Sequence, residues 1–185
     1  MSYKLNSIFI DKYPPEAAVW CGKNNATIEE IEPQDGVRRF QIVAIPEPTL
    51  AEVKADALSR IDTATSSAIL AGFEYEVDGE SLHFSYDSFD QQNFVDSASV
   101  ATLALSGQQG LPTSVTWNAY RNYTPETGGE LVRLDFTPQT FLGLYMQGAL
   151  AHKGLQMEIG GQRKAAIDAA ESVEAVQALL ERWGL

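Results

Sequence analysis

The sequence predicts an α+β protein: a small N-terminal β module, followed by long helices packed with a short antiparallel β-hairpin. Two patterns support this prediction. Short segments separated by turn residues fill the chain up to about residue 45. After residue 49, apolar residues recur every three or four positions over long stretches. A proline-rich linker at 46–48 separates the patterns, so the predicted domains are 1–45 and 49–185.

Four short segments of the N-terminal module are predicted to be strands. Alternation is clearest in the last of them, where Phe40 and Ile42 are expected on one face of the sheet. Arg39, Gln41 and Val43 are expected on the other face. A sheet this small is marginal alone, so we expect it to pack on something else. The four segments are 6–10, 16–20, 27–31 and 37–43.

A long amphipathic helix is predicted from Thr49 to Gly72. Thr49 and Glu52 have the spacing of a capping box, and Gly72 suits a left-handed helix end. An alanine-rich stripe buries little apolar area per residue, but it permits the close approach of a neighbouring helix. Such a helix either sits in a tight bundle or pairs with a partner chain. The stripe consists of Leu50, Val53, Ala57, Ile61, Ala64 and Ala68, and its candidate partner-binding residues are Ala57, Ala64 and Ala68.

The segment after this helix predicts a turn between strands and then a second helix. Residues 77–80 carry the turn signal Asp78-Gly79, between 73–75 and the strand-like stretch 82–86. The second helix is predicted to begin at Ser88 or Asp87, with Ser88 and Gln91 spaced as a capping box.

A hairpin and two further helices complete the predicted domain. The strands are 113–120 and 130–136, joined by the polar loop 122–129. Tyr120 and Tyr123, near the hairpin tip, are candidate partner-binding residues if they are exposed. Trp117 and Phe136 are expected in the core with most of this aromatic set.

The last long helix is predicted to begin at Thr137-Pro138, with threonine as N-cap and proline in the first turn. Gly160-Gly161 either loosens this helix or lets another backbone approach it. Ser172 is predicted to cap a short terminal helix.

Charge and composition narrow the function classes. The formal net charge is −12, with a pI near 4.5. This charge argues against direct binding of nucleic acid or an anionic membrane, since both need a positive field. No apolar run reaches the length of a membrane span, and no signal-peptide pattern is found. The single cysteine, Cys21, excludes an internal disulfide framework.

No catalytic motif, cofactor fingerprint or metal-ligand pattern is found, so we predict a non-enzyme without cofactor or metal. His83 and His152 could join Asp87 and Asp90 at a metal. A strand-face position for His83, and a bond to a carbonyl or a side chain for His152, are favoured. The polar turn 90–93 could bind a ligand or bridge chains, although capping explains it better. For Cys21, a half-buried small residue is favoured over a catalytic thiol.

Four stretches in order carry a resemblance to a known family. They are the helix ending at 69–73, the 84–87 and 90–93 motifs, the Trp117 strand followed by Phe136-Thr137 and a helix with Ala151-His152-Lys153, and the closing 167–176. Residues 49–183 therefore resemble a phage-associated domain of unknown function, found in proteins encoded near tail-fibre genes. The N-terminal segment is similar to leader segments of tail-fibre assembly proteins.

The resemblance implies a phage tail or tail-fibre-associated protein and no assigned reaction. It implies a tail or tail-fibre protein as partner, a homo-oligomer as an option, and a place in the host cytoplasm during assembly or in the virion tail. The leading hypothesis is therefore a structural component or an assembly chaperone acting by protein–protein contacts.

Two other hypotheses remain open at this point. The first is an acidic inhibitor that mimics nucleic acid, supported if the carboxylates of 29–35 and Glu47 cluster on one surface. The second is an enzyme or metal protein whose site forms between subunits.

Overall fold

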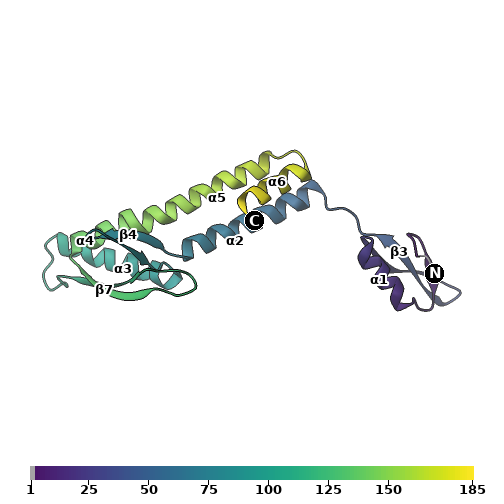
Figure 1. Ribbon diagram of the computed structural model, residues 1–185, viewed down its shortest axis with the longest axis horizontal. Helices are drawn as coiled ribbons and strands as arrows, with labels where there is room; N and C mark the ends of the chain where they lie inside the picture. Colours follow the sequence, from purple (N-terminus) through teal and green to yellow (C-terminus); the bar gives the residue numbers. More distant parts are fainter. Residues whose placement is uncertain (1–2) are drawn as a thin grey trace. The chain divides into compact units, whose positions relative to one another are not determined.

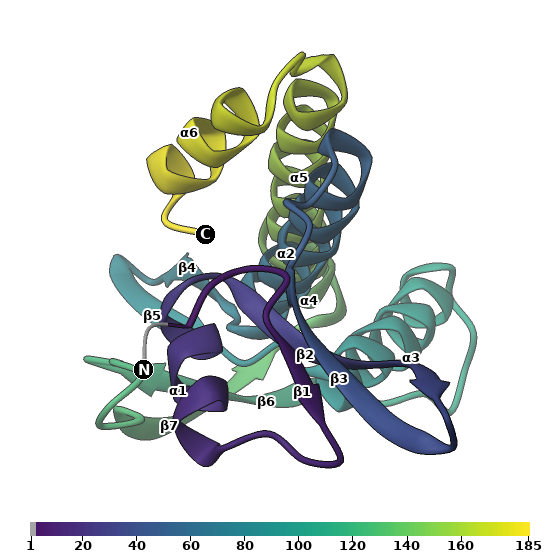
Figure 2. The same ribbon diagram turned by 90° about the vertical axis from the view of Figure 1, so that its right-hand side faces the viewer.

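The protein is an α+β protein, as the sequence predicts. The computed structural model describes residues 3–185 and divides the chain into two compact units, Met1–Thr49 and Leu50–Leu185 (Figures 1 and 2). The proline-containing linker stretch has no regular structure and closes the first unit. Each unit is described by itself below.

The first unit is a three-stranded antiparallel sheet with one helix. The strand order is β1-β3-β2. Phe40 and Ile42 of β3 share a face, as predicted, and Ile42 is wholly buried with Cys21 and Ala26. Cys21 belongs to the helix, which therefore covers this face of the sheet. The elements are β1 (Ile8–Ile10), α1 (Pro15–Lys23), β2 (Ala26–Gln34) and β3 (Val37–Ala44).

The prediction of a strand at 16–20 is wrong, because α1 occupies this segment. Pro15 lies in the first turn, where its fixed φ suits a helix and its missing N–H removes no bond. Glu16 in the first turn and Lys23 in the last complement the helix dipole. Ala17 and Cys21, four residues apart, supply the buried stripe.

Two Asp-Gly pairs form the tight turns of the hairpins that the sequence indicates. Asp35 and Gly36 have φ values of 50° and 76°, and Asp78 and Gly79 have 52° and 82°. Positive φ at both central positions matches the right-handed twist of paired strands. The turns therefore fix the pairing of β2 with β3, and that of the later strands Phe73–Val77 and Glu80–Phe84.

The second unit contains a four-stranded antiparallel sheet of order β4-β5-β6-β7. The predicted hairpin 113–120 with 130–136 is confirmed as β6 with β7. One residue pair, His83 with Tyr120, joins it to the β4–β5 hairpin. The elements are α2 (Leu50–Leu70), β4 (Phe73–Val77), β5 (Glu80–Phe84), α3 (Ser88–Leu105), β6 (Val115–Arg121), β7 (Glu130–Phe136), α4 (Pro138–Gly143), the π-helix η1 (Leu144–Leu150), α5 (Ala151–Ala169) and α6 (Val173–Trp183).

An aromatic core lies between this sheet and the helices α3, α4 and η1. Phe94 is fully buried, with its ring centroid 4.2 Å from Trp117 and 5.8 Å from Phe141. The expected core positions of Trp117 and Phe136 are confirmed. One face of the sheet is thus packed and the other is left to polar side chains.

The alanine-rich stripe of α2 packs on the unit's own helices α5 and α6. Ala57 is fully buried, so no partner reaches it in this structure. A Cβ on Gly160 of α5 would lie 2.5 Å from Thr65 Oγ1, so this glycine permits the close helix approach. The tight-bundle alternative for α2 is the one observed.

The segment predicted as one long helix from Pro138 contains a π-helical stretch, η1. Gly148 lies in it, and a Cβ there would meet the Phe73 ring at 2.5 Å. Two predicted N-caps are confirmed: Thr137 at the start of α4 accepts from the Thr140 N–H, and Ser172 at the start of α6 accepts from the Ala175 N–H.

Candidate functional site

The candidate site is a polar cavity of about 360 Å³ in the second unit, called here the polar hollow. It lies where the end of β5, the first turn of α3 and the first half of β6 meet. Its lining residues are Ser85, Asp87, Asp90, Asn93, Thr116, Trp117, Asn118 and Tyr120.

The hollow exists because β5 and β6 separate. They share only the pair His83 and Tyr120, after which the chain leaves β5 and enters α3 at Ser88. Thr116 and Asn118 therefore have β7 on one side and no strand on the other. The unpaired side of β6 borders the hollow. The Thr116 hydroxyl donates to Asp135 Oδ1 of β7 at 2.6 Å, whereas the Asn118 side chain forms no hydrogen bond within the described residues.

The first turn of α3 supplies the acidic wall. Asp87 is the N-cap, and its Oδ1 accepts from the N–H groups of Phe89 and Asp90, both at 2.8 Å. The predicted capping role of Ser88 is therefore wrong, because Asp87 takes it. Both capping bonds use one carboxylate oxygen, so Asp87 Oδ2 is left for another donor.

Gln91 fixes the orientation of this turn. Its amide donates to the Tyr86 carbonyl at 3.3 Å, and its Oε1 accepts from Lys153 Nζ at 3.1 Å. Asp90 and Asn93 lie on the neighbouring side of the turn and line the hollow. Local bonding thus explains Gln91 of the polar turn 90–93, whereas Asp90 and Asn93 are left for a ligand.

The hollow is acidic, and several of its acceptors have no hydrogen-bond partner. Within residues 3–185, the side chains of Asp90, Asn93 and Asn118 form no hydrogen bond with another residue, and no lysine or arginine lines the cavity. Arg133 lies directly across from Asn118 on β7 but forms no ion pair with a described residue. The cavity therefore presents two carboxylates without an internal counter-charge.

A second cavity of about 290 Å³, the histidine hollow, shares Ser85 and Tyr120 with the polar hollow. His83 is buried there, with its ring stacked on Tyr123 at a centroid distance of 3.6 Å and an angle of 3°. Its Nδ1 lies 3.0 Å from Glu74 Oε1 and donates to that carboxylate. The strand-face position predicted for His83 is confirmed.

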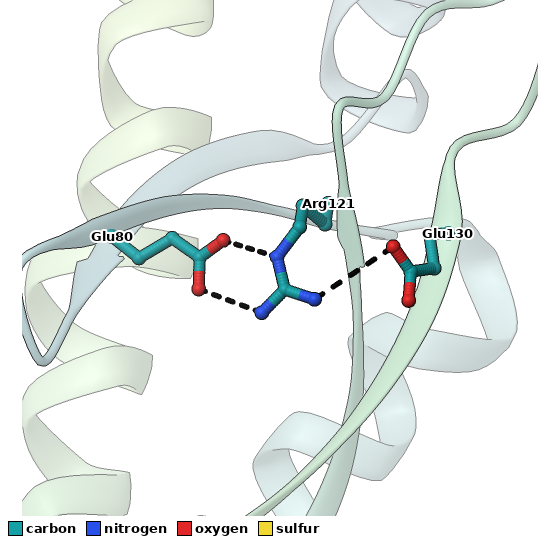
Figure 3. Close-up of polar contacts among 3 residues, drawn as sticks. All are labelled: Glu80, Arg121 and Glu130. Carbon is teal, nitrogen blue, oxygen red and sulfur yellow. Dashed lines mark hydrogen bonds and ion pairs between the residues drawn. The ribbon is translucent and has the colours of Figure 1, made fainter.

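An ion-pair cluster holds the strands that frame the histidine hollow (Figure 3). Arg121 at the end of β6 binds both carboxylate oxygens of Glu80 and lies 3.8 Å from Glu130. The bidentate bond to Arg121 lowers the pKa of Glu80 and raises that of the guanidinium. The cluster ties β5, β6 and β7 together next to the loop that carries Tyr123.

The site offers hydrogen-bond acceptors, but no complete proton relay is seen in residues 3–185. His83 and Glu74 form a pair, yet Ser85 Oγ forms no hydrogen bond with His83. No group of three metal-ligating side chains occurs in the described part of the chain. His152 donates to the carbonyls of Ala68 and Ile69 at 3.2 and 3.3 Å, as predicted.

The remaining predicted contact residues have different surroundings. Tyr120 and Tyr123 are half-buried, with ring centroids 6.1 Å apart. Both line the histidine hollow, and Tyr120 also lines the polar hollow. Ala64 and Ala68 are half-buried on α2. Cys21, predicted to be half-buried, is 4% exposed, so burial is more complete than expected.

Ser85, Thr116 and Asn118 were not among the predicted site residues. A signal for two of them is present, because Thr116, Asn118 and Tyr120 alternate with the apolar Trp117 and Ala119. This alternation places them on one face of a strand. It does not indicate that the first turn of α3 lies beside them.

The first unit has a cavity of its own, on the sheet face that α1 does not cover. It measures about 500 Å³. Its apolar part is formed by Ile8, Ile10 and Val37, which are 46%, 69% and 41% exposed. Its polar lining comes from Gln34, Asp35 and Arg39.

Comparison with known protein families gives a match to the second unit. A family model described as a domain of unknown function (DUF4376) matches residues 52–179, more than half of the 185-residue chain. The chain belongs to the DUF4376 family. No curated protein and no solved structure matches it. The DUF4376 match begins in α2 and ends in α6, so it contains both hollows and excludes the first unit.

Within the described residues of this DUF4376 protein, no helix has the length and apolar character needed to cross a membrane.

Proposed function

We propose that this DUF4376 protein is a bacteriophage tail-fibre-associated protein that acts by binding other proteins and not by catalysis. It serves as a structural component of the tail or as an assembly chaperone for the fibre, and it works in the host cytoplasm during assembly. The sequence resemblance described above supports the phage assignment. The uncovered face of the N-terminal sheet supports the mode of action.

That face carries the observation on which the proposal depends. Ile10 is 69% exposed and Ile8 46% exposed on the edge strand β1, beside Val37 of β3. Covering apolar area is stabilising by about 25 cal/mol per Å². An edge strand also offers unpaired backbone groups to another chain. Exposed apolar side chains next to a free edge are therefore suited to a protein partner.

Co-purification with the product of the neighbouring fibre gene tests the proposal. Ile10→Asp places a charge on the open face and is expected to reduce fibre recovery at least about tenfold. Val19→Asp is the matched control, because Val19 is 59% exposed in the same unit but belongs to α1. Wild-type protein that fails to bind the fibre, or equal recovery of both variants, would contradict the proposal.

Mass spectrometry of mature particles separates the two roles. A structural component stays in the particle in a fixed ratio to the fibre. A chaperone binds fibre in the infected cell and is absent from mature particles.

The alternative hypothesis of a nucleic-acid mimic receives less support than the proposed function, because of how the N-terminal carboxylates are arranged. Glu29 and Glu30 are neighbours on β2 and therefore project from opposite faces. Glu30 also forms a bidentate pair with Arg38, with both bonds at 2.8 Å. The carboxylates of this strand do not present one continuous acidic surface.

A further inference from the structure

We infer that the polar hollow binds the guanidinium group of an arginine side chain. The inference rests on the proposed function only in taking that arginine from a partner protein. It concerns the second unit, whereas the proposed fibre contact concerns the first.

Charge is the first reason. Asp87 keeps one carboxylate oxygen free of the helix cap, and Asp90 has no side-chain partner within residues 3–185. Two neighbouring carboxylates without a counter-ion favour a cation, and the chain's net charge of −12 adds to this preference.

The chain's own nearby cations do not supply this charge. Arg121 is bound to Glu80 and Glu130, and Lys153 donates to Gln91. Arg133 is adjacent in the β6–β7 register but is exposed and does not line the cavity. The hollow is therefore open to a cation from outside the chain.

The distribution of acceptors favours arginine over lysine. Asp90 and Asn93 come from α3, Asn118 comes from β6 and Ser85 directly follows β5, so acceptors lie on several sides of the cavity. A guanidinium group carries five N–H donors in a rigid plane, whereas an ammonium group carries three at one point.

Aromatic surface and cavity size agree with this ligand. Trp117 and Tyr120 contribute to the lining, and guanidinium groups pack favourably on aromatic rings. The cavity volume of about 360 Å³ falls at the small end of ligand sites, which begin at about 300 Å³. The unpaired edge of β6 gives the backbone next to such a side chain a place to bond.

NMR titration of the ¹⁵N-labelled full chain with N-acetyl-arginine methylamide tests the inference. Saturable shifts are expected at the Trp117 indole N–H and the side-chain amides of Asn93 and Asn118, with a dissociation constant of about 1–10 mM. The matching citrulline derivative is neutral and almost the same shape. It is expected to bind at least about tenfold more weakly.

Two variants test whether arginine binding takes place in the polar hollow. Asp90→Asn removes one charge from the hollow and is expected to weaken arginine binding about tenfold. Asp96→Asn removes the same charge from the same helix outside the hollow, where its amide oxygen can still accept from Gln92. This control is expected to change the affinity by less than about twofold. Retained spectral dispersion shows that both variants are folded.

Several results would overturn the inference. Equal binding of the citrulline derivative, or unchanged binding by Asp90→Asn, would show that charge is not recognised. Tighter binding of a neutral methyl glycoside at the same residues would reassign the hollow to a sugar. Absence of saturable shifts up to about 50 mM would show no site. Loss of fibre binding in the Ile10→Asp experiment leaves this titration unaffected, so the two proposals fail separately.

Discussion

The two sheets of this protein leave opposite kinds of surface uncovered. In the first unit the open face is apolar at Ile8 and Ile10, and the covered face has a small core around Ile42. In the second unit the open face carries polar residues such as Glu74 and Asn118, and the covered face packs a large aromatic core. The first unit therefore has a much smaller core of its own than the second.

The largest effect is expected in the aromatic core of the second unit. Phe94→Ala removes a fully buried ring and is expected to cost about 3–5 kcal/mol in the free energy of unfolding. Urea unfolding monitored by near-UV circular dichroism measures it. Phe89→Ala is the control on the same helix, since Phe89 is 76% exposed, and it should change stability by less than about 0.5 kcal/mol. Similar losses for both would mean that α3 does not pack as described.

The first unit is expected to lose its fold after a comparable change. Ile42→Ala removes the central fully buried side chain and is expected to cost about 2–5 kcal/mol. Because few other residues of this unit are buried, amide exchange should show β1–β3 unfolded while the second unit stays protected. Ile10→Ala, on the open face, should leave exchange rates unchanged. Protection of β3 in Ile42→Ala would contradict the dependence on this small core.

A smaller effect is expected at the end of α2, where the sheet and helix meet. Gly72 has a φ of 89°, and a Cβ there would meet the Phe84 carbonyl and lie 2.7 Å from His83 Nε2. Gly72→Ala combines backbone strain of about 1–3 kcal/mol with this contact. Gly79→Ala has a similar φ and nothing within 4 Å, so it reports strain alone. Thermal unfolding should therefore rank Gly72→Ala as the less stable variant.

The smallest effect concerns the bidentate Arg–Glu pair that each unit contains. The hydrogen bonds from Arg38 and Arg121 lower the pKa of Glu30 and Glu80 below the ordinary value of 4.5. The stabilisation that each ion pair provides is complete when the pH is above the ordinary pKa of glutamate. It is lost as the pH falls through the lowered pKa. Arg38→Gln and Arg121→Gln should each abolish the loss of stability at low pH that the pair causes in its own unit. Urea unfolding between about pH 3 and 7 measures this change. Added salt should reduce both effects, because all four groups reach solvent.

Local chemistry made much of the fold predictable. Asp35-Gly36 and Asp78-Gly79 indicate tight turns because aspartate and glycine tolerate positive φ. Thr137 and Ser172 indicate helix starts because their hydroxyls satisfy free N–H groups. The strand predicted at 16–20 is wrong because Pro15 starts a helix there, and proline suits a first helical turn.

Long-range pairing accounts for what the sequence did not predict. A single residue pair, His83 with Tyr120, joins the two hairpins, and no local signal specifies it. The polar hollow depends on the same junction, because β5 and β6 separate beyond it. Asp90 and Asn93 were visible as polar residues of a helix start. Their placement beside Asn118 follows only from the assembled sheet.

The single thiol of the chain allows the opening of the first unit to be followed by chemical labelling. Cys21 is 4% exposed in the core beneath β3, and the second unit contains no cysteine. A thiol reagent can therefore modify the protein only when the first unit opens, and the labelling rate measures how often it does so. A bound partner on the open sheet face would slow this reaction without touching the sulfur atom.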